Sequence, residues 1–157
     1  MNIQLILFNV ILGISSTSCM HQNNRGNNEA NITSEVQKQR IEKIQLTERT
    51  RGFSKSIVLT SSSKTVNTNE VIDNSKTTPS EWKNISKLAE SIALSKIADL
   101  PSPTTGRHSD RALAATIIIT SNGTDYTSGS FDSGYPPKEL EALYNAIMGT
   151  QNEKKAP

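Results

Sequence analysis

A short apolar segment that ends at a lone cysteine lies near the N-terminus. Residues 3–14 read IQLILFNVILGI, and nine of these twelve side chains are aliphatic or aromatic. A helix needs about twenty apolar residues to span a bilayer, so this segment is too short to cross one. Its length and the small residues at 15–18 are typical of a secretory signal peptide, although no Lys or Arg precedes it. We therefore expect residues 1–18 to be removed and to take no part in the folded domain.

The lone cysteine indicates how the N-terminus is processed. Cys19 is the only cysteine of the chain, and it directly follows the small residues Thr17 and Ser18. This arrangement resembles the lipobox of bacterial lipoproteins, although Ser16 stands where that pattern usually has an aliphatic residue. The resemblance implies cleavage before Cys19, lipid attachment to its thiol with acyl chains such as palmitate, and anchoring in the cell envelope, at the outer membrane rather than the inner one. Several acyl chains hold a protein stably at a membrane, whereas a single chain does not.

Two other interpretations of this segment remain open. Ser16 and Ser18 also form a small-x-small site for ordinary cleavage, which would give a secreted or periplasmic protein with a free thiol. Alternatively, the hydrophobic N-terminus stays uncleaved and the cysteine has no role.

Composition divides the remaining chain into one domain and two polar ends. Residues 20–34 read MHQNNRGNNEANITS, which is too polar to form a core. We therefore assign residues 19–40 to a lipid-anchored disordered tether and residues 150–157 to a disordered tail. The intervening residues, 41–149, are long enough for a single domain.

The overall charge and composition exclude several classes of protein. The chain has 17 Lys and Arg residues against 15 Asp and Glu residues, for a formal net charge of +2. This balance gives no case for nucleic-acid binding. The low hydrophobic content of 34% and the single cysteine exclude a polytopic membrane protein and a disulfide scaffold.

Alternating side chains predict strands in the first half of the domain. Residues 53–60 alternate most clearly, and residues 64–69 give a weaker strand. Residues 42–49 also fit a strand, but a helix over 34–45 is an open alternative because its residues favour helices. Residues 73–78 are expected to form a polar loop.

A helix is expected to begin at Pro79. Thr78 can cap it and Glu81 follows three positions later, which completes a capping box. Apolar side chains then recur at helical spacing, and Pro101 ends the pattern. The apolar stripe consists of Trp82, Ile85, Leu88, Ala89 and Ile92, and Leu94, Ile97 and Leu100 extend it through a short last turn.

A hairpin and a second helix are expected in the remainder. Residues 112–120 read ALAATIIIT, which indicates a buried strand, and Asn122-Gly123 is a strong hairpin turn before a partner strand at 125–131. Pro136-Pro137 precedes a second apolar stripe that Gly149 ends. The stripe consists of Leu140, Leu143, Tyr144 and Ile147.

These elements follow one another in the order βββαββα. Short connections within each group of strands favour a mainly antiparallel sheet, with both amphipathic helices on one face. The expected fold is therefore an α+β two-layer sandwich.

Residues suited to catalysis are few. His108 lies beside Ser109 and Asp110, but adjacency in sequence does not make a catalytic triad, which needs groups that converge in space. One domain histidine and no further cysteine leave no zinc-ligand pattern, and no phosphate-binding loop is present. We therefore predict no catalytic residues, no metal and no cofactor. Carboxylates such as Asp125 and Asp132 could serve a hydrolase only if they converge, and we expect Asp132 to cap the turn before the second helix.

Two basic patches are the candidate binding residues. Arg49, Arg51 and Lys55 surround Gly52 in the first patch, and Arg107, Asp110 and Arg111 form the second. They could converge, through Arg51 and Arg107, into a surface that binds an anion or a partner. The alternative is a solvated strand edge and a loop held by an arginine paired with Asp110.

The domain resembles a group of small lipoproteins of Gram-negative bacteria, for which no activity is known. The likeness rests on the Arg51-Gly52-Phe53 segment, on residues 103–112 and on the 131–137 segment. The residues that carry it are Pro103, Thr104, Arg107, Asp110 and Ala112 in the second of these, and Phe131, Asp132, Gly134, Pro136 and Pro137 in the third. The resemblance implies a single envelope domain and assigns no catalytic residue.

The sequence therefore favours a lipid-anchored envelope protein with a small binding or interaction domain, whose partner is an envelope protein or a glycan. The alternatives are a small envelope hydrolase that uses carboxylates and a purely structural secreted domain.

Overall fold

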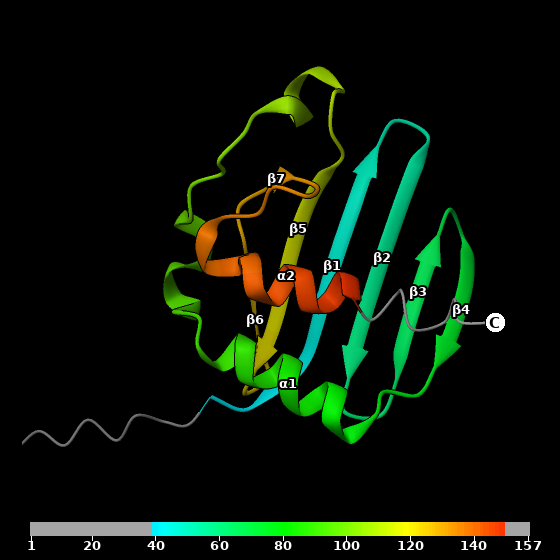
Figure 1. Ribbon diagram of the computed structural model, residues 1–157, viewed down its shortest axis with the longest axis vertical. Coiled ribbons are helices and arrows are strands. Elements are labelled where there is room, and N and C mark those ends of the chain that lie inside the picture. The colour runs from blue at the N-terminus through cyan, green and yellow to red at the C-terminus, as the bar shows by residue number, and fades with distance from the viewer. Residues whose placement is uncertain (1–38, 150–157) are drawn as a thin grey trace, which may run out of the picture. The chain divides into compact units, whose positions relative to one another are not determined.

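The computed structural model of the chain describes residues 39–149 (Figure 1). The expected signal peptide, Cys19, all of the expected tether except residues 39 and 40, and the expected tail lie outside these residues. The described elements are, in order, β1 (Ile41–Thr50), β2 (Phe53–Thr60), β3 (Lys64–Thr68), β4 (Val71–Ser75), α1 (Pro79–Glu90), the 3₁₀ helices η1 (Leu94–Asp99) and η2 (Gly106–Ser109), β5 (Ala114–Ser121), β6 (Thr124–Thr127), β7 (Phe131–Asp132), the 3₁₀ helix η3 (Lys138–Leu140) and α2 (Glu141–Gly149).

The domain is an α+β fold built on one seven-stranded sheet. The strands follow the order β4-β3-β2-β1-β5-β6, and β7 pairs with β5 beside β6. Each pairing between these strands is antiparallel. The first strand of residues 39–149 is therefore central, since β1 pairs with β2 on one side and with β5 on the other.

Helices α1 and α2 lie over the same face of the sheet (Figure 1). Alternate residues of the strands point to this face, as Ile44 and Leu46 do in β1, and they are almost fully buried. The helices contribute residues such as Ile85 and Ile147 to the same core. Each fully buried side chain of this size stabilises the fold by about 1.5–3 kcal/mol, and together they fix which face of each strand turns inward.

The start of α1 agrees with the prediction. Thr78 accepts a hydrogen bond from the backbone N–H of Glu81, and the Glu81 carboxylate accepts one from the backbone N–H of Thr78. This reciprocal pair is the predicted capping box, and Pro79 stands at the first helical position.

The order of elements differs from the prediction at two strands. Residues 71–75, which overlap the predicted polar loop at 73–78, form the edge strand β4. The predicted strand at 125–131 is interrupted, so that β6 and the two-residue β7 pair with different parts of β5. The open choice between helix and strand at 42–49 is settled as the strand β1.

The first helix is also shorter than its apolar stripe. It ends at Glu90, and Leu94 and Ile97 are buried from the 3₁₀ helix η1 instead. Within residues 39–149, no helix is long and apolar enough to cross a membrane.

Candidate functional site

The predicted site residues come from segments at one end of the sheet. The turn between β1 and β2 carries Arg51, and η2 with the residues after it carries Arg107, Asp110 and Arg111; both segments lie where β1 ends and β5 begins (Figure 1). The loop that holds β7 reaches the same end, because β7 pairs with the first residues of β5. We call this region the hairpin end of the sheet.

Arg107 points into the protein at the hairpin end. Its guanidinium Nη1 lies 3.1 Å from Oδ1 of Asp132, and it also donates to the backbone carbonyl of Thr104 at 2.6 Å and to the Ser102 hydroxyl at 3.0 Å. The Arg107 side chain keeps only 13% of its surface exposed. Arg107 is therefore a structural cation. The loop is held by an arginine–aspartate pair, as in the alternative interpretation, but the acid is Asp132 and not Asp110.

Asp132 organises the whole loop before η2. Its Oδ2 accepts hydrogen bonds from the Thr104 hydroxyl and the Gly106 N–H, both at 2.6 Å, and its Oδ1 accepts one from the Arg107 N–H at 2.9 Å. The residue is 3% exposed. Its role is thus to hold residues 104–107, and the turn after it is closed by its backbone carbonyl, which accepts from the N–H of Tyr135.

These contacts set the charge of Asp132. Burial alone raises the pKa of its carboxyl, but the hydrogen bonds from Thr104, Arg107 and Gly106 outweigh burial and hold the pKa well below its usual range. The group therefore stays ionised near neutral pH and is unsuited to proton transfer there.

A second buried carboxylate lies on β1. Glu48 shares the helix-covered face with Ile44 and Leu46 and is 4% exposed. Its Oε1 accepts hydrogen bonds from the Ser133 hydroxyl at 2.5 Å and from the Tyr144 hydroxyl at 3.0 Å. We call Glu48, Ser133 and Tyr144 the buried hydroxyl cluster.

The cluster is closed by backbone and ring contacts. The Gly134 N–H donates to the Tyr144 hydroxyl at 2.9 Å, and the Tyr144 ring packs edge-on against Phe131 with the ring centroids 5.8 Å apart. Burial, with the nearby charge of Glu48, raises the pKa of Tyr144. The tyrosine therefore stays neutral and donates to Glu48.

The backbone N–H groups beside this cluster are already occupied. An acyl-transfer site needs free donors, often backbone N–H groups, to stabilise an oxyanion. The N–H groups of Ser133, Gly134 and Tyr135 already donate to the Leu113 carbonyl, the Tyr144 hydroxyl and the Asp132 carbonyl, respectively. The carboxylates that a hydrolase would bring together instead have separate partners, since Asp125 lies on β6 and contacts Thr120 and Lys43.

Sequence reasoning missed the buried hydroxyl cluster. One signal was present, because Glu48 falls on the same face of its strand as two buried aliphatic residues. A carboxylate in that position must find hydrogen-bond donors when the strand is buried. Nothing in the sequence identified Ser133 and Tyr144 as those donors, since they lie 85 and 96 positions away.

The other predicted residues stay at the surface. Arg51 and Asp110 are exposed in tight turns, and Asp110 has a positive φ of 55°. Arg111 is exposed, and its Nε donates to the Ser109 hydroxyl at 2.9 Å. Lys55 is half-buried on β2, directly opposite Glu48 in the register.

A shallow polar hollow adjoins Lys55. It measures about 260 Å³ and lies over β1, β2 and β3. Its lining includes two cations, Arg49 and Lys55, and the polar residues Ser54, Ser56 and Asn67. Glu48 is also a lining residue, but its carboxylate points to the helix-covered face and is hydrogen-bonded within the buried hydroxyl cluster. Among the described residues at the hairpin end, the exposed cations Arg49, Arg51 and Arg111 outnumber the exposed acids Asp110 and Glu70.

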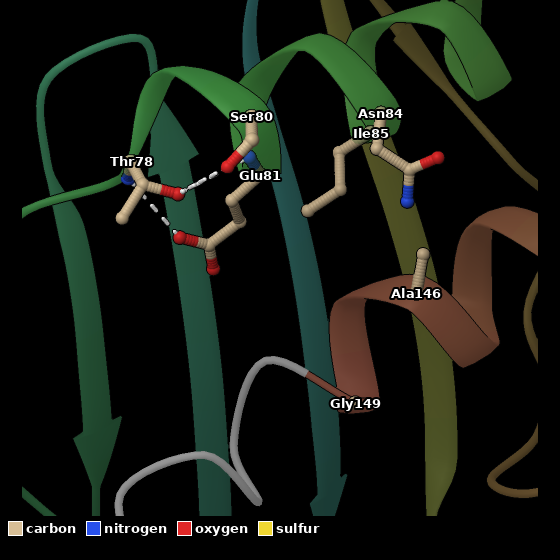
Figure 2. A pocket seen from close by; sticks show the side chains of 7 residues that line it. All are labelled: Thr78, Ser80, Glu81, Asn84, Ile85, Ala146 and Gly149. Atoms are coloured by element: carbon tan, nitrogen blue, oxygen red, sulfur yellow. Dashed lines mark hydrogen bonds between the residues drawn. The ribbon is translucent and has the colours of Figure 1, made fainter.

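A larger hollow lies elsewhere, between the start of α1 and the end of α2 (Figure 2). It measures about 500 Å³ and is lined by Thr78, Ser80, Glu81, Asn84, Ile85, Ala146 and Gly149. Thr78 and Glu81 form the cap of α1, as the dashed lines in Figure 2 show in part, so these two side chains of its polar wall have a structural role.

Residues 39–149 contain no group of three or more His, Cys, Asp or Glu side chains that could hold a metal ion. His108 is exposed on η2. No family model matches the chain, and no curated protein and no solved structure shows significant similarity to it.

Proposed function

We propose that this chain is a lipid-anchored protein of the cell envelope whose α+β domain binds a partner there. Two independent features support the proposal. The apolar leader that ends at Cys19 supports the anchor. The exposed basic side chains at the hairpin end support the binding surface.

The binding surface rests on one observation. The carboxylates of Glu48 and Asp132 are buried and hydrogen-bonded, whereas Arg49, Arg51 and Arg111 are exposed at the same end of the sheet. Basic groups that are held close together and are not neutralised attract an anionic partner and steer its approach. We therefore assign Arg51, Lys55 and Arg111 to contact with an acidic group, carried by an envelope protein or a glycan, and Arg107 and Asp110 to shaping the loop.

The fold suits a rigid presentation of this surface. We interpret the arrangement of one sheet and two covering helices as a two-layer sandwich. In that interpretation the hairpin end is the rim between the layers, where loops meet on a fixed scaffold, which is a common place for binding sites.

The mass of the N-terminal peptide tests the anchor. The chain would be expressed in a Gram-negative host, with Cys19→Ala as the control variant. Loss of residues 1–18 together with acyl chains on Cys19 is the expected result. Cleavage without acylation would leave a secreted or periplasmic protein with a free thiol and would refute the lipid anchor.

Recovery of a partner tests the binding function. The purified protein would be mixed with envelope extract and treated with a chemical cross-linker, and the molecules linked to it would be identified. The same experiment with a variant carrying Arg51→Glu and Lys55→Glu is the control. We expect one species to be enriched by the native protein and depleted by the variant. Equal recovery by both would refute the assignment to the hairpin end.

The alternative functions gain no specific support. A carboxylate hydrolase would need converging acids, and Asp110, Asp125 and Asp132 have no common partner among the described contacts. A purely structural domain would show equal recovery by the native protein and the variant.

A further inference from the structure

The edge strand β4 carries the most exposed aliphatic side chains of the described chain. Val71 and Ile72 keep 74% and 60% of their surface exposed, and Tyr135 is the other large apolar residue exposed within residues 39–149. The two aliphatic residues are adjacent, so they point to opposite faces of the sheet. An edge strand with apolar groups on both faces is a template for pairing with another strand.

The opposite edge of the sheet is protected. Strand β6 contacts η1, and a Cβ placed on Gly129, just after β6, would lie 3.1 Å from the Ala98 carbonyl oxygen. That edge is therefore covered by packed chain. Among the described residues, no segment covers β4 in the same way; it is the last strand on its side of the sheet (Figure 1).

The hairpin between β3 and β4 determines which backbone groups face outward. Its two-residue loop consists of Asn69 and Glu70, both with positive φ (46° and 73°). In such a loop the flanking residues, Thr68 and Val71, exchange backbone hydrogen bonds, and every second pair along the strands does the same. The N–H and C=O groups of Ile72 and Asn74 are therefore directed to the open edge.

We propose that β4 pairs antiparallel with β4 of a second copy of the chain, about a twofold axis at Ile72. The outward groups allow axes at Ile72, Asp73 or Asn74. An axis at Asp73 would place two carboxylates opposite each other, which is unfavourable. An axis at Asn74 would place Asn74 at the centre of the ladder, so the Ile72 side chains of the two copies would not face each other.

The axis at Ile72 satisfies both packing and charge. Ile72 then faces Ile72 of the second copy, and Asp73 faces Val71 rather than another acid. Glu70 lies opposite Asn74 of the second copy and diagonal to its Lys76, so the carboxylate and the ammonium group attract each other. The twofold symmetry repeats this pair. Cross-strand pairs of this kind are favourable.

The pairing extends the sheet without any new fold. A five-residue strand is short, so the contact falls below the roughly 1,200–2,000 Å² of a standard stable interface. We therefore expect an association that is weak and depends on concentration. It is centred on Ile72, which is not among the residues assigned to the proposed binding surface, although the turn that precedes β4 contacts the hairpin end through Asn69 and Ser54. It does not depend on the proposed lipid anchor.

Single cysteines in the Cys19→Ala background test the register. Residues that exchange hydrogen bonds across antiparallel strands have Cα atoms about 5.5 Å apart, a distance that a disulfide can bridge. Ile72→Cys is therefore expected to give a disulfide-linked dimer under mild oxidation. Asn74→Cys is the matched control, because its counterpart would lie four residues along the strand, about 13 Å away. Equal linkage by both variants, or faster linkage through Asn74→Cys, would overturn the proposal.

Analytical ultracentrifugation of the same background without added cysteines tests the association itself. We expect the dimer fraction to rise with protein concentration and the association constant to fall at least tenfold in Ile72→Lys. Tyr135→Lys, which removes an exposed apolar group elsewhere, is expected to leave the constant unchanged. A native protein that stays monomeric at all concentrations, or an equal effect of both lysines, would refute pairing through β4.

Discussion

The Tyr144 hydroxyl donates a hydrogen bond to Oε1 of Glu48 at 3.0 Å and thereby joins α2 to β1 across 96 positions of sequence. The same hydroxyl accepts from the Gly134 N–H, so it ties the β7 loop to both elements. This one atom connects the three segments that meet beneath the hairpin end, which makes it a sensitive point for substitution.

Replacing Tyr144 with Phe removes this connection without changing the ring. The Gly134 N–H loses its acceptor and Glu48 loses one donor, so the free energy of unfolding should fall by about 1–3 kcal/mol. Urea denaturation at neutral pH measures the change. Glu48→Gln keeps an acceptor oxygen and should cost less than Glu48→Ala, which leaves both hydroxyls without their acceptor. Equal losses for the two Glu48 variants would contradict the arrangement.

The same tyrosine predicts a dependence on alkaline pH. Burial raises the pKa of Tyr144 above its ordinary value of 10.0. Its contribution to stability is therefore complete below pH 10.0 and is lost as the pH rises through the higher folded value, because the unfolded chain ionises first. Unfolding free energies measured across this range should decline more steeply for the native protein than for Tyr144→Phe. Parallel curves would show that the tyrosine is not buried in this way.

Asp132 predicts the opposite behaviour at acid pH. The pKa of its carboxyl is depressed from an ordinary value of 3.8, because hydrogen bonds from Thr104, Arg107 and Gly106 outweigh its burial. The ionised carboxylate therefore stabilises the fold fully above pH 3.8, and this contribution is lost as the pH falls below that value toward the folded pKa. Asp132→Asn should be less stable than the native protein near neutral pH, and the difference should narrow as the pH falls. A constant difference would argue against an ionised Asp132.

Gly106 is expected to resist any side chain. A Cβ at this position would lie 3.0 Å from Oδ2 of Asp132 and 3.3 Å from the Cβ of Ala112. Gly106→Ala should therefore push the loop off the carboxylate and destabilise the fold by about 1–3 kcal/mol, the usual cost of overpacking. Gly149→Ala is the control, since nothing lies within 4 Å of its added Cβ. Thermal denaturation of the two variants should separate clearly, and equal midpoints would refute the tight packing of this loop.

Charge reversal at the hairpin end should affect binding and not folding. Arg51 is exposed, so Arg51→Glu is expected to change the free energy of unfolding by less than about 0.5 kcal/mol. Binding of an acidic partner identified by cross-linking should weaken at least tenfold, and more so at low salt. Lys83→Glu, an equal change of charge on the exposed side of α1, is the control. Similar weakening by both variants would indicate a general charge effect with no local surface.

The sequence predicted those parts of the fold that depend on neighbours in the chain. The capping box at Thr78, the bounds of β2 and the turn at Asn122-Gly123 all follow from local spacing, and Asn122 and Gly123 have the positive φ values that this turn requires. Strand β4 was missed because Asp73 and Asn74 are poor strand formers, and only pairing with β3 holds them in a strand.

The candidate site was less accessible to sequence reasoning. Local spacing drew attention to Arg107 and Asp110, which are close in the chain, but the carboxylate that binds Arg107 lies 25 positions away in Asp132. No helical or strand period links such residues, so their pairing depends on how β7 is placed beside β5. The exposure of the surface arginines was easier to predict, because charged side chains are usually exposed whatever their neighbours.

The central position of β1 also determines when the domain can form. Its partner β2 comes next in the chain, but its other partner, β5, is far along the sequence. For example, the Thr47 hydroxyl donates to the carbonyl of Thr116, 69 residues further on. A ladder between such distant segments must close a long loop, which slows folding. Until β5 has emerged from the ribosome, one edge of β1 has no partner strand, and Ile44 and Leu46 lack much of their cover. The centre of the sheet can therefore close only once the chain is available to about residue 121.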